Sequence, residues 1–365
     1  MKKLKKTEVT TVISKPDVNA EVRKAINPEK YDEYRKEWLE ATNLNLVTKF
    51  PLQIDFELNY SCNFTCPMCT WNAESTEQKG KQTWFDFEVF KEVIDQGVEK
   101  GLKSIRLNYI NEPLIRKDIV KFISYARKAG ILDIYFSTNG SLLTDELSRN
   151  LISSGLLRLQ VSLDAFTKST YEKIRTGGNF DDVIKKTLRF LEIRDELNVK
   201  LPTLRVNFVK NDTNKHELDD FVRFWEGKAD SVGIQDLVGV MEGYGKKTQD
   251  EIESTKLAGE FRCAQPFQRL TMRYNGTVLP CCTFYAAEMP IGQIKTNVKT
   301  EFSNVDNIGL LDKSLKSKLI IGTIEEIWNG KQMKFIRDIH KKGEFWKHPV
   351  CKKCVLSTSH FDETQ

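Results

Sequence analysis

Between residues 50 and 237, short β-rich runs alternate with stretches in which apolar residues recur at helical spacing. The β-rich runs are 52–59, 104–109, 131–137, 157–163, 203–209 and 231–237. The helical stretches between them are 87–100, 119–129, 145–154, 181–196 and 215–226. Strands that are joined by crossover helices run parallel in one sheet. The alternation therefore predicts an α/β fold with a parallel sheet that is either open or curled into a barrel.

The predicted strands each have one polar and one apolar face. In the first strand, for example, Asp55 and Glu57 lie on the face opposite Phe56. The polar positions, which come from five of the six strands, are Gln53, Asp55, Glu57, Asn59, Arg106, Asn108, Gln160, Ser162, Asp164, Arg205, Asn207 and Gln235. A parallel sheet with crossover helices seldom leaves a face bare to solvent. We therefore expect the apolar face to meet the helices and the polar face to line a ligand cavity.

The composition of the 365 residues, 40% hydrophobic and 29% charged, is that of an ordinary globular protein. No apolar run approaches the roughly 18 residues of a membrane-spanning helix. The N-terminal Met-Lys-Lys-Leu-Lys-Lys leads into polar residues, not into the apolar core of a secretory signal. We expect a cytoplasmic protein without membrane contact. A net charge of +5, from 56 basic and 51 acidic residues, gives no indication of nucleic acid binding.

The chain divides into five predicted parts. They are an N-terminal extension at 1–50 with a helix at 31–46, the strand–helix region at 51–240, a connector at 241–262, a cysteine-rich domain at 263–355 and a tail at 356–365. In the cysteine-rich domain, Asn275-Gly276 predicts a type I′ turn between hairpin strands at 269–274 and 277–279. A polar insertion from residue 294 to about residue 321 precedes a predicted helix at 324–341.

Eight cysteines form two groups that are separated by a long stretch without cysteine. Cys62, Cys66 and Cys69 form the front group. The rear group consists of Cys263, Cys281, Cys282, Cys351 and Cys354. Cysteines of a cytosolic chain stay reduced and more often bind metal than form disulfides. The spacing therefore predicts two metal sites in two domains.

The front group directly follows the first strand, at the sheet edge where α/β proteins place their sites. Cys62, Cys66 and Cys69 can bind three irons of a four-iron cluster and leave the fourth iron open to another ligand. Zinc held by three cysteines is the alternative. A structural zinc site needs a fourth protein ligand, however, and no histidine lies near in the sequence.

The run Asn59-Tyr60-Ser61-Cys62-Asn63-Phe64-Thr65-Cys66-Pro67-Met68-Cys69 resembles the signature of the radical S-adenosylmethionine (SAM) superfamily, and the resemblance extends over most of the chain. Asn111-Glu112-Pro113 is similar to the family's Gly-Gly-Glu-Pro motif, whose acidic residue binds the amino group of SAM. Ile110 and Asn111 replace the two glycines. The resemblance implies a partial (β/α)6 TIM-like barrel, a front [4Fe–4S] cluster and SAM. The further SAM contacts that it implies are Met68, through its backbone, Ser137, Asn139, Ser162 and Asp164.

The chemistry that the resemblance implies is reductive cleavage of SAM to a 5′-deoxyadenosyl radical, which takes a hydrogen atom from an unactivated carbon. The protein then holds the cofactor and the substrate in place and excludes water. Residues such as Glu112, Ser137 and Ser162 are also common as caps and in turns. Their occurrence at successive strand ends favours the cofactor site.

The rear group resembles the SPASM/twitch auxiliary-cluster domain, in which a cysteine before a hairpin, one after it and a later pair ligate a second [4Fe–4S] cluster. The positions in this sequence are Cys263, Cys281, Cys351 and Cys354. Because no further cysteine follows in residues 355–365, we expect one fully ligated cluster in the shorter twitch arrangement. A four-thiolate zinc site is the alternative, since its ligands are identical.

Cys282 should not share a cluster with Cys281, because adjacent residues of a strand point to opposite faces. It is either a small core thiol or a hydrogen-atom donor to a product radical, as in some radical epimerases. The four histidines have no metal-ligand spacing and are expected to be solvated. They are His216, His340, His348 and His360.

The predicted substrate contacts are Glu57, Arg106, Arg175, Arg205, Asn207 and Gln235. Arg175 lies in Ile174-Arg175-Thr176-Gly177-Gly178, which resembles a segment that recurs in the family. Carboxylates and amides suit a polyhydroxylated substrate, and arginine suits a phosphate or carboxylate. Because no dedicated peptide-binding module precedes Phe50, a carbohydrate, cyclitol or nucleotide-linked small molecule is favoured over a peptide.

The expected function is that of a radical SAM oxidoreductase that dehydrogenates a secondary alcohol and uses a one-electron reductant such as flavodoxin or ferredoxin. The reason is that a rear cluster without an open iron suits electron acceptance more than substrate coordination. A radical epimerase and a peptide-modifying maturase are alternatives. A zinc-stabilised, non-catalytic binding protein is an alternative of another class.

Overall fold

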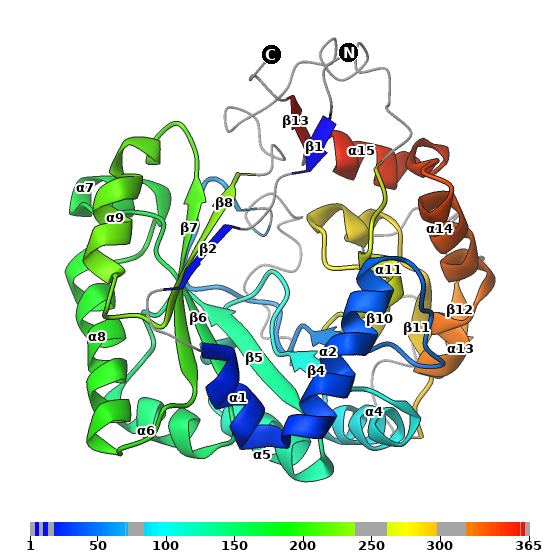
Figure 1. Cartoon of the computed structure of the whole chain (residues 1–365), viewed down its shortest axis with the longest axis horizontal. Coiled ribbons are helices and arrows are strands. Elements are labelled where there is room, and N and C mark those ends of the chain that lie inside the picture. Colours follow the sequence, from blue (N-terminus) through cyan, green and yellow to red (C-terminus); the bar gives the residue numbers. More distant parts are fainter. Residues whose placement is uncertain are drawn as a thin grey trace.

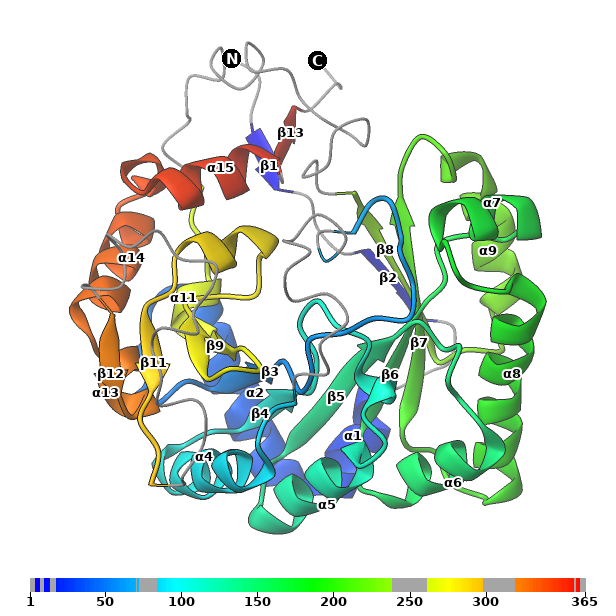
Figure 2. The same cartoon turned by 180° about the vertical axis from the view of Figure 1, so that it is seen from behind.

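A curved sheet forms the centre of the structure. The computed structural model describes residues 4–6, 10–13, 18–69, 71, 84–237, 261–297, 319–357 and 359–361. Within that part of the chain, an 11-stranded sheet has the order β12-β11-β10-β9-β3-β4-β5-β6-β7-β8-β2. Helices surround the outer face of the sheet (Figures 1 and 2).

The six predicted parallel strands are present, and the partial barrel is confirmed. They are β3 (Gln53–Phe56), β4 (Ser104–Arg106), β5 (Asp133–Thr138), β6 (Arg158–Ser162), β7 (Thr203–Lys210) and β8 (Ser231–Asp236). Neighbours pair in parallel from β3 to β8. All carboxyl ends of these strands therefore meet at one rim of the barrel.

The crossover helices are α4 (Phe87–Lys100), α5 (Ile119–Ala129), α6 (Asp145–Ser153), α7 (Lys168–Ile174), α8 (Phe180–Glu196) and α9 (Leu218–Trp225), and the sequence pattern did not predict α7. The bounds of α4 follow from its caps. The carboxylate of Asp86 accepts from the N–H of Glu88 (2.7 Å), and Gly101 ends the helix with φ +105°. A glycine with positive φ, Gly130, also ends α5.

The apolar faces of the strands pack against these helices, as predicted. Ile54, Phe56 and Leu58 are each 0% exposed. The ring of Phe56 lies 4.9 Å from the ring of Phe90 on α4, edge to face. Burying one such side chain contributes about 1.5–3 kcal/mol. The polar faces of the strands consequently turn into the barrel.

The N-terminal residues form two strands at sheet edges and two helices, of which the second packs at the amino ends of the barrel strands. They are β1 (Leu4–Lys6), β2 (Thr10–Ile13), α1 (Val18–Ile26) and α2 (Pro28–Thr42). Tyr34 and Ala41 of α2 are buried, in clusters with Leu157 and Leu52, which precede β6 and β3. Asn27 caps the start of α2, which begins earlier than the predicted helix at 31–46. Two pairings were not predicted: β2 lies antiparallel beside β8, and β1 lies beside β13 (Ser359–Phe361).

The cysteine-rich part extends the barrel sheet. Its elements are α11 (Gln265–Gln268), β9 (Arg269–Met272), β10 (Thr277–Leu279), η3 (Phe284–Glu288), β11 (Gly292–Ile294), β12 (Ile320–Gly322), α13 (Ile324–Trp328), α14 (Lys331–Lys341), η6 (Phe345–Lys347) and α15 (Pro349–Ser357). The predicted hairpin is β9 and β10. Strand β9 also pairs in parallel with β3, from Gln53 opposite Arg269 to Phe56 opposite Met272. The hairpin thus continues the sheet beyond the first barrel strand.

Two predictions in this part were wrong. The hairpin turn is not type I′, because Gly276 alone has a positive φ (+78°) and the N–H of Gly276 bonds to the carbonyl of Arg273 (2.9 Å). The predicted helix at 324–341 is broken into α13 and α14. Gly330 has extended backbone (φ −69°, ψ 165°) at the start of α14, and a Cβ atom there would overlap the side chain of Ile320.

Several predicted segments lie largely outside the described residues. They are the connector at 241–262, the polar insertion at 294–321 and the tail at 356–365. In the part of the chain that the structure describes, no helix combines the length and the apolar character needed to cross a membrane.

A buried ion pair ties α8 to the sheet, and its loss should destabilise the fold. Arg194 Nη1 lies 2.5 Å from Oδ2 of Asp230, which also accepts from the N–H of Leu204 (2.6 Å). Asp230→Ala leaves a buried guanidinium without its carboxylate. The free energy of unfolding should therefore fall by about 3–5 kcal/mol in urea titrations followed by circular dichroism.

Asp145→Ala is the matched control for that variant. Asp145 forms an ion pair with Arg189 (3.0 Å), but its side chain is 59% exposed. Loss of an exposed pair should change the free energy of unfolding by less than about 1 kcal/mol. If both variants lost the same free energy of unfolding, burial of the ion pair would not explain the destabilisation.

Candidate active site

The front cysteine group lies on the loop that follows β3, at the carboxyl ends of the barrel strands. Cys66 is buried, and Cys62 and Cys69 are partly buried. The N–H of Cys69 donates to the carbonyl of Cys66 (3.0 Å), and the N–H of Phe64 donates to Sγ of Cys62 (3.5 Å). All three thiols line one cavity, so the structure brings these predicted ligands together.

Residues 174–178 support this loop. The N–H of Thr65 donates to the carbonyl of Thr176 (2.9 Å). A Cβ atom at Gly178 would lie 2.8 Å from the ring of Phe64. The family-like segment around Arg175 therefore places the cysteine loop through its backbone, a role that the sequence did not suggest.

The front thiols fit an iron–sulfur cluster by their chemistry. Burial raises the pKa of Cys62 to about 12, and the charges of Glu112, Cys66 and Cys69 add to this rise. Such thiols stay protonated unless a cation offsets their charge, and bound metal does so. Within the described residues, no three or more His, Cys, Asp or Glu side chains are grouped as ligands of a metal ion. Thiolates of a four-iron cluster each bind a different iron and need not converge on one point.

Glu112 follows β4 and lines the same cavity. Its Oε1 accepts from the N–H of Leu114 (3.0 Å) and the hydroxyl of Thr138 (2.7 Å), and its Oε2 accepts from the N–H of Asn139 (2.7 Å). A carboxylate has about four acceptor positions, so one remains for a ligand N–H. Burial raises the pKa of Glu112 to about 7, although these donors oppose the rise.

Three other predicted SAM contacts line the cavity: Ser137, Asn139 and Ser162. Met68 and Asp164 do not line it. Sδ of Met68 accepts from Nδ2 of Asn211 (3.9 Å). Asp164 is 0% exposed, has φ +63°, and forms an ion pair with Arg175. Its carboxylate thus pairs with an arginine that lines the cavity.

The polar interior of the barrel is a cavity of about 520 Å³, as the strand pattern predicted. Five of the predicted substrate residues line it: Arg106, Arg175, Arg205, Asn207 and Gln235. Arg269 adds a fourth guanidinium that the sequence did not single out, whereas Glu112 is the one carboxylate among the described lining residues. The balance of charge suits an anionic ligand.

Glu57 lies outside the cavity lining, unlike the other predicted substrate residues. It is 0% exposed, and Nε of Arg273 donates to its Oε2 (2.9 Å). The prediction failed here because strand parity cannot distinguish a side chain that lines a cavity from one that neutralises a buried arginine. Glu57 instead joins β3 to the β9–β10 hairpin.

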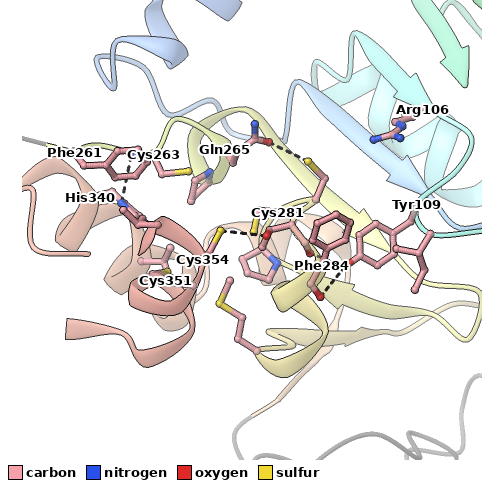
Figure 3. Close-up of a pocket in the computed structure, with 18 of the residues that line it drawn as sticks. Arg106, Tyr109, Phe261, Cys263, Gln265, Cys281, Phe284, His340, Cys351 and Cys354 are labelled. Carbon is pink, nitrogen blue, oxygen red and sulfur yellow. Dashed lines mark hydrogen bonds between the residues drawn. The ribbon is translucent and has the colours of Figure 1, made fainter. Parts of the chain in front are cut away.

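The four predicted rear ligands, Cys263, Cys281, Cys351 and Cys354, lie around a second cavity of about 670 Å³ (Figure 3). Cys263 precedes α11, Cys281 follows β10, and the other two lie on α15. Burial raises the pKa of Cys351 to about 12, with further contributions from Cys263 and Cys354. This donor set fits a second cluster by the same argument as the front group.

Two neighbours of the rear thiols were missed. His340, expected to be solvated, is 2% exposed, and its Nδ1 accepts from the N–H of Cys263 (3.4 Å; Figure 3). The hydroxyl of Thr283 lies 3.2 Å from Sγ of Cys354. Neither residue has a spacing or composition signal, because tertiary packing alone brings them to the cysteines.

The two cavities adjoin, since Arg106, Tyr109, Ile110, Gln235 and Phe284 line both of them. The hydroxyl of Tyr109 donates to the carbonyl of Thr283 (2.6 Å), which links the loop of Glu112 to the rear group. The front and rear thiol groups therefore line adjoining cavities that share these five residues.

Cys282 lines the second cavity, beside the predicted rear ligands. Its Sγ donates to Oε1 of Gln265 (3.5 Å), and Nη1 of Arg269 lies 4.0 Å away. The side chain is partly buried and does not lie in an apolar core. This position is compatible with the predicted role as a hydrogen donor.

Comparison with known proteins agrees with this geometry. Residues 56–223 match the family model of the Radical SAM superfamily, and residues 263–306 match the SPASM model, described as an iron-sulfur cluster-binding domain. The resemblance that the sequence suggested is thus confirmed for both domains. They imply SAM and [4Fe–4S] clusters as cofactors.

Curated relatives match about half of the chain. A probable GTP 3′,8-cyclase of Methanococcus maripaludis is 34% identical over 157 residues, 43% of this chain and 49% of that protein. A GTP 3′,8-cyclase of Desulforamulus reducens is 34% identical over 164 residues, 44% of this chain and 48% of that protein. The chain spans about half the length of the curated relatives it matches.

Solved structures share the fold. SuiB of Streptococcus suis bound to S-adenosylmethionine has a TM-score of 0.57 at 16% identity, over 90% of this chain and 77% of that chain. Native anSMEcpe with bound AdoMet has a TM-score of 0.54 at 13% identity, over 83% of this chain and 88% of that chain. At these identities the likeness shows the fold alone.

Anaerobic reconstitution should give about eight irons per chain, four at each cysteine group. Changing Cys62, Cys66 and Cys69 together to Ala should leave about four, because the rear ligands stay intact. Iron analysis and electron paramagnetic resonance measure both values. One zinc per chain without iron at the rear group would contradict the second cluster.

The affinity for SAM should rise as the pH rises through about 7. Glu112, with its pKa raised to about 7, is a carboxylate above that pH and can accept a charge-assisted hydrogen bond from the amino group. Glu112→Gln should weaken SAM binding by about 1.5–3 kcal/mol, roughly ten- to a hundredfold, and remove this pH dependence. Equilibrium binding between pH 6 and 8 tests it. The front iron content is the control, and unchanged affinity would refute this role of Glu112.

Proposed function

We propose that this chain, which contains a radical SAM domain at residues 56–223 and a SPASM domain at residues 263–306, is a radical SAM oxidoreductase. It oxidises a secondary alcohol on a small, polar, anionic substrate such as a sugar, cyclitol or nucleotide-linked compound. The observation that carries the proposal is the pair of adjoining cavities, one at each thiol group. A substrate at their junction, beside Arg106, Tyr109 and Gln235, lies between the two groups.

The cofactor ligands follow from the site. Cys62, Cys66 and Cys69 would hold the front cluster. The rear cluster would be held by Cys263, Cys281, Cys351 and Cys354. When bound, the front cluster with SAM supplies a 5′-deoxyadenosyl radical, and the rear cluster supplies an electron acceptor.

The side chains of the chain bind and orient the reactants. Glu112 accepts an N–H of the SAM amino group at its remaining acceptor position. Guanidinium and amide groups of the cavity hold the charged and hydroxyl groups of the substrate. The apolar Ile110 and Phe284 at the junction exclude water, which protects a reactive intermediate.

The four rear thiols favour oxidation over substrate coordination. With a thiolate on each iron, no iron of the rear cluster is left open to a substrate atom. The alcohol loses one hydrogen atom to the adenosyl radical, and it loses the hydroxyl proton and one electron in the step that forms the ketone.

A second candidate is cyclisation of a nucleoside triphosphate. It is supported by the two relatives named GTP 3′,8-cyclase and by the guanidinium groups of the cavity, which suit a phosphate. The two reactions differ in the mass of their products. Oxidation removes two hydrogens from the substrate, whereas cyclisation does not. Product mass therefore separates them.

Oxidation predicts a product that is lighter than the substrate by two hydrogens, with one SAM consumed for each product. The reconstituted protein is incubated anaerobically with SAM, a chemical reductant and phosphorylated sugars, cyclitols or nucleotides, and the mixtures are followed by mass spectrometry. Cys69→Ala should abolish 5′-deoxyadenosine formation, because it removes a ligand of the front cluster.

Heavy water distinguishes oxidation from epimerisation. Epimerisation would leave the mass balance unchanged apart from one solvent deuterium at the reacting carbon. A deuterated epimer whose formation is abolished by Cys282→Ala would contradict the oxidoreductase. It would assign Cys282 as the hydrogen donor.

A further inference from the structure

Arg205 on β7 has an uncompensated charge inside the cavity. Its Nε is shielded from solvent and has no hydrogen-bond acceptor in the described part of the chain, which is also true of Nε of Arg175 and Arg269. Burial lowers the pKa of Arg205, and the nearby guanidinium of Arg158 acts in the same direction. A partly buried guanidinium without an acceptor is stabilised when an anion joins it.

The other three guanidinium groups of the cavity have protein acceptors. Arg175 pairs with Asp164, Arg269 lies 3.5 Å from Asp55, and Nε of Arg106 donates to Asn108 (3.1 Å). Carboxylates therefore neutralise Arg175 and Arg269, whereas Arg106 has a neutral amide as its acceptor. Arg205 differs from them in the same cavity, so its partner is expected to come from outside the chain.

Gly233 on β8 makes the room for this guanidinium. Arg205 pairs with Ser231 in the sheet, so Gly233 is the diagonal neighbour on the same face. A Cβ atom at position 233 would overlap Nε and Nη2 of Arg205 and lie 2.5 Å from its Cζ. The guanidinium thus lies directly against the backbone of β8. Any larger residue at 233 would move it.

We propose that Arg205, seated against Gly233, anchors an oxyanion group of the substrate, a phosphate or a carboxylate. Because the Nε–Nη2 edge lies against Gly233, the Nη1 side of the guanidinium is the one left to donate to such a group. Asn207 and Gln235 line the cavity on the same two strands and add amide donors. The proposal rests on the proposed function only in taking this cavity as the substrate site.

Two variants test the anchor by different routes. Arg205→Gln removes the charge, whereas Gly233→Ala keeps the charge and displaces the guanidinium. The displaced group is the far end of a flexible side chain, so the alanine variant should fold. Titration calorimetry of the SAM-bound, cluster-loaded protein with inorganic phosphate should show binding that is weaker by about ten- to a hundredfold in both variants.

Arg149→Gln is the matched control, since Arg149 is 44% exposed and pairs with Glu196 outside the cavity. It should leave phosphate binding unchanged. Acetate titrations identify the anion: binding of acetate but not phosphate, lost in both cavity variants, supports the anchor and assigns a carboxylate. Unchanged anion binding in Arg205→Gln would overturn the proposal.

SAM also carries a carboxylate, so its binding is measured in the same variants. If Arg205→Gln weakens SAM as strongly as it weakens the added anion, the arginine serves the cofactor and the substrate anchor is refuted. Unchanged SAM affinity with weaker anion binding supports the anchor. Because these titrations need no turnover, their failure is distinct from a failure of the oxidation assay.

Discussion

The parallel pairing of β3 with β9 fixes the relation between the two thiol groups. Residues 53–56 lie beside residues 269–272, and two buried ion pairs reinforce the contact, Glu57 with Arg273 and Asp55 with Arg269. The front cysteines follow β3, and Cys281 follows the hairpin that begins with β9. The two adjoining cavities depend on this pairing. A single sheet, not a linker, sets the spacing of the predicted cofactor sites.

Local patterns were sufficient to predict the barrel. The bounds of α4 and α5 agree with the predicted 87–100 and 119–129, because an apolar stripe, an acidic residue at the start and a glycine at the end all mark the same residues. Strand parity predicted the cavity for a similar reason, since residues two apart share a face. The pairing of β9 with β3 could not be predicted in this way, because the two strands lie far apart in the sequence and nothing local specifies their contact.

The site was predicted where the residue type and its spacing determine the chemistry, and missed where burial decides it. Seven cysteines in their spacings indicated two clusters, but Asp164 and Glu57 were taken as ligand contacts although each neutralises a buried arginine. His340 was expected in solvent and lies beside Cys263, because α14 packs against the rear group. Sequence specifies which side chains can bind a ligand. Packing determines which of them are already used by the protein.

The hairpin also bears on how the chain is made. A ribosome releases β3 well before β9, so during that interval the outer edge of β3 lacks the hairpin strand and Arg273 is not yet there to pair with Glu57. An open edge of this kind is a template for pairing with another nascent chain. The rear cysteines come from three separate segments, the last of which ends near the C-terminus. Assembly of the rear site therefore waits for α15, and a barrel excised without the hairpin would leave the edge of β3 open.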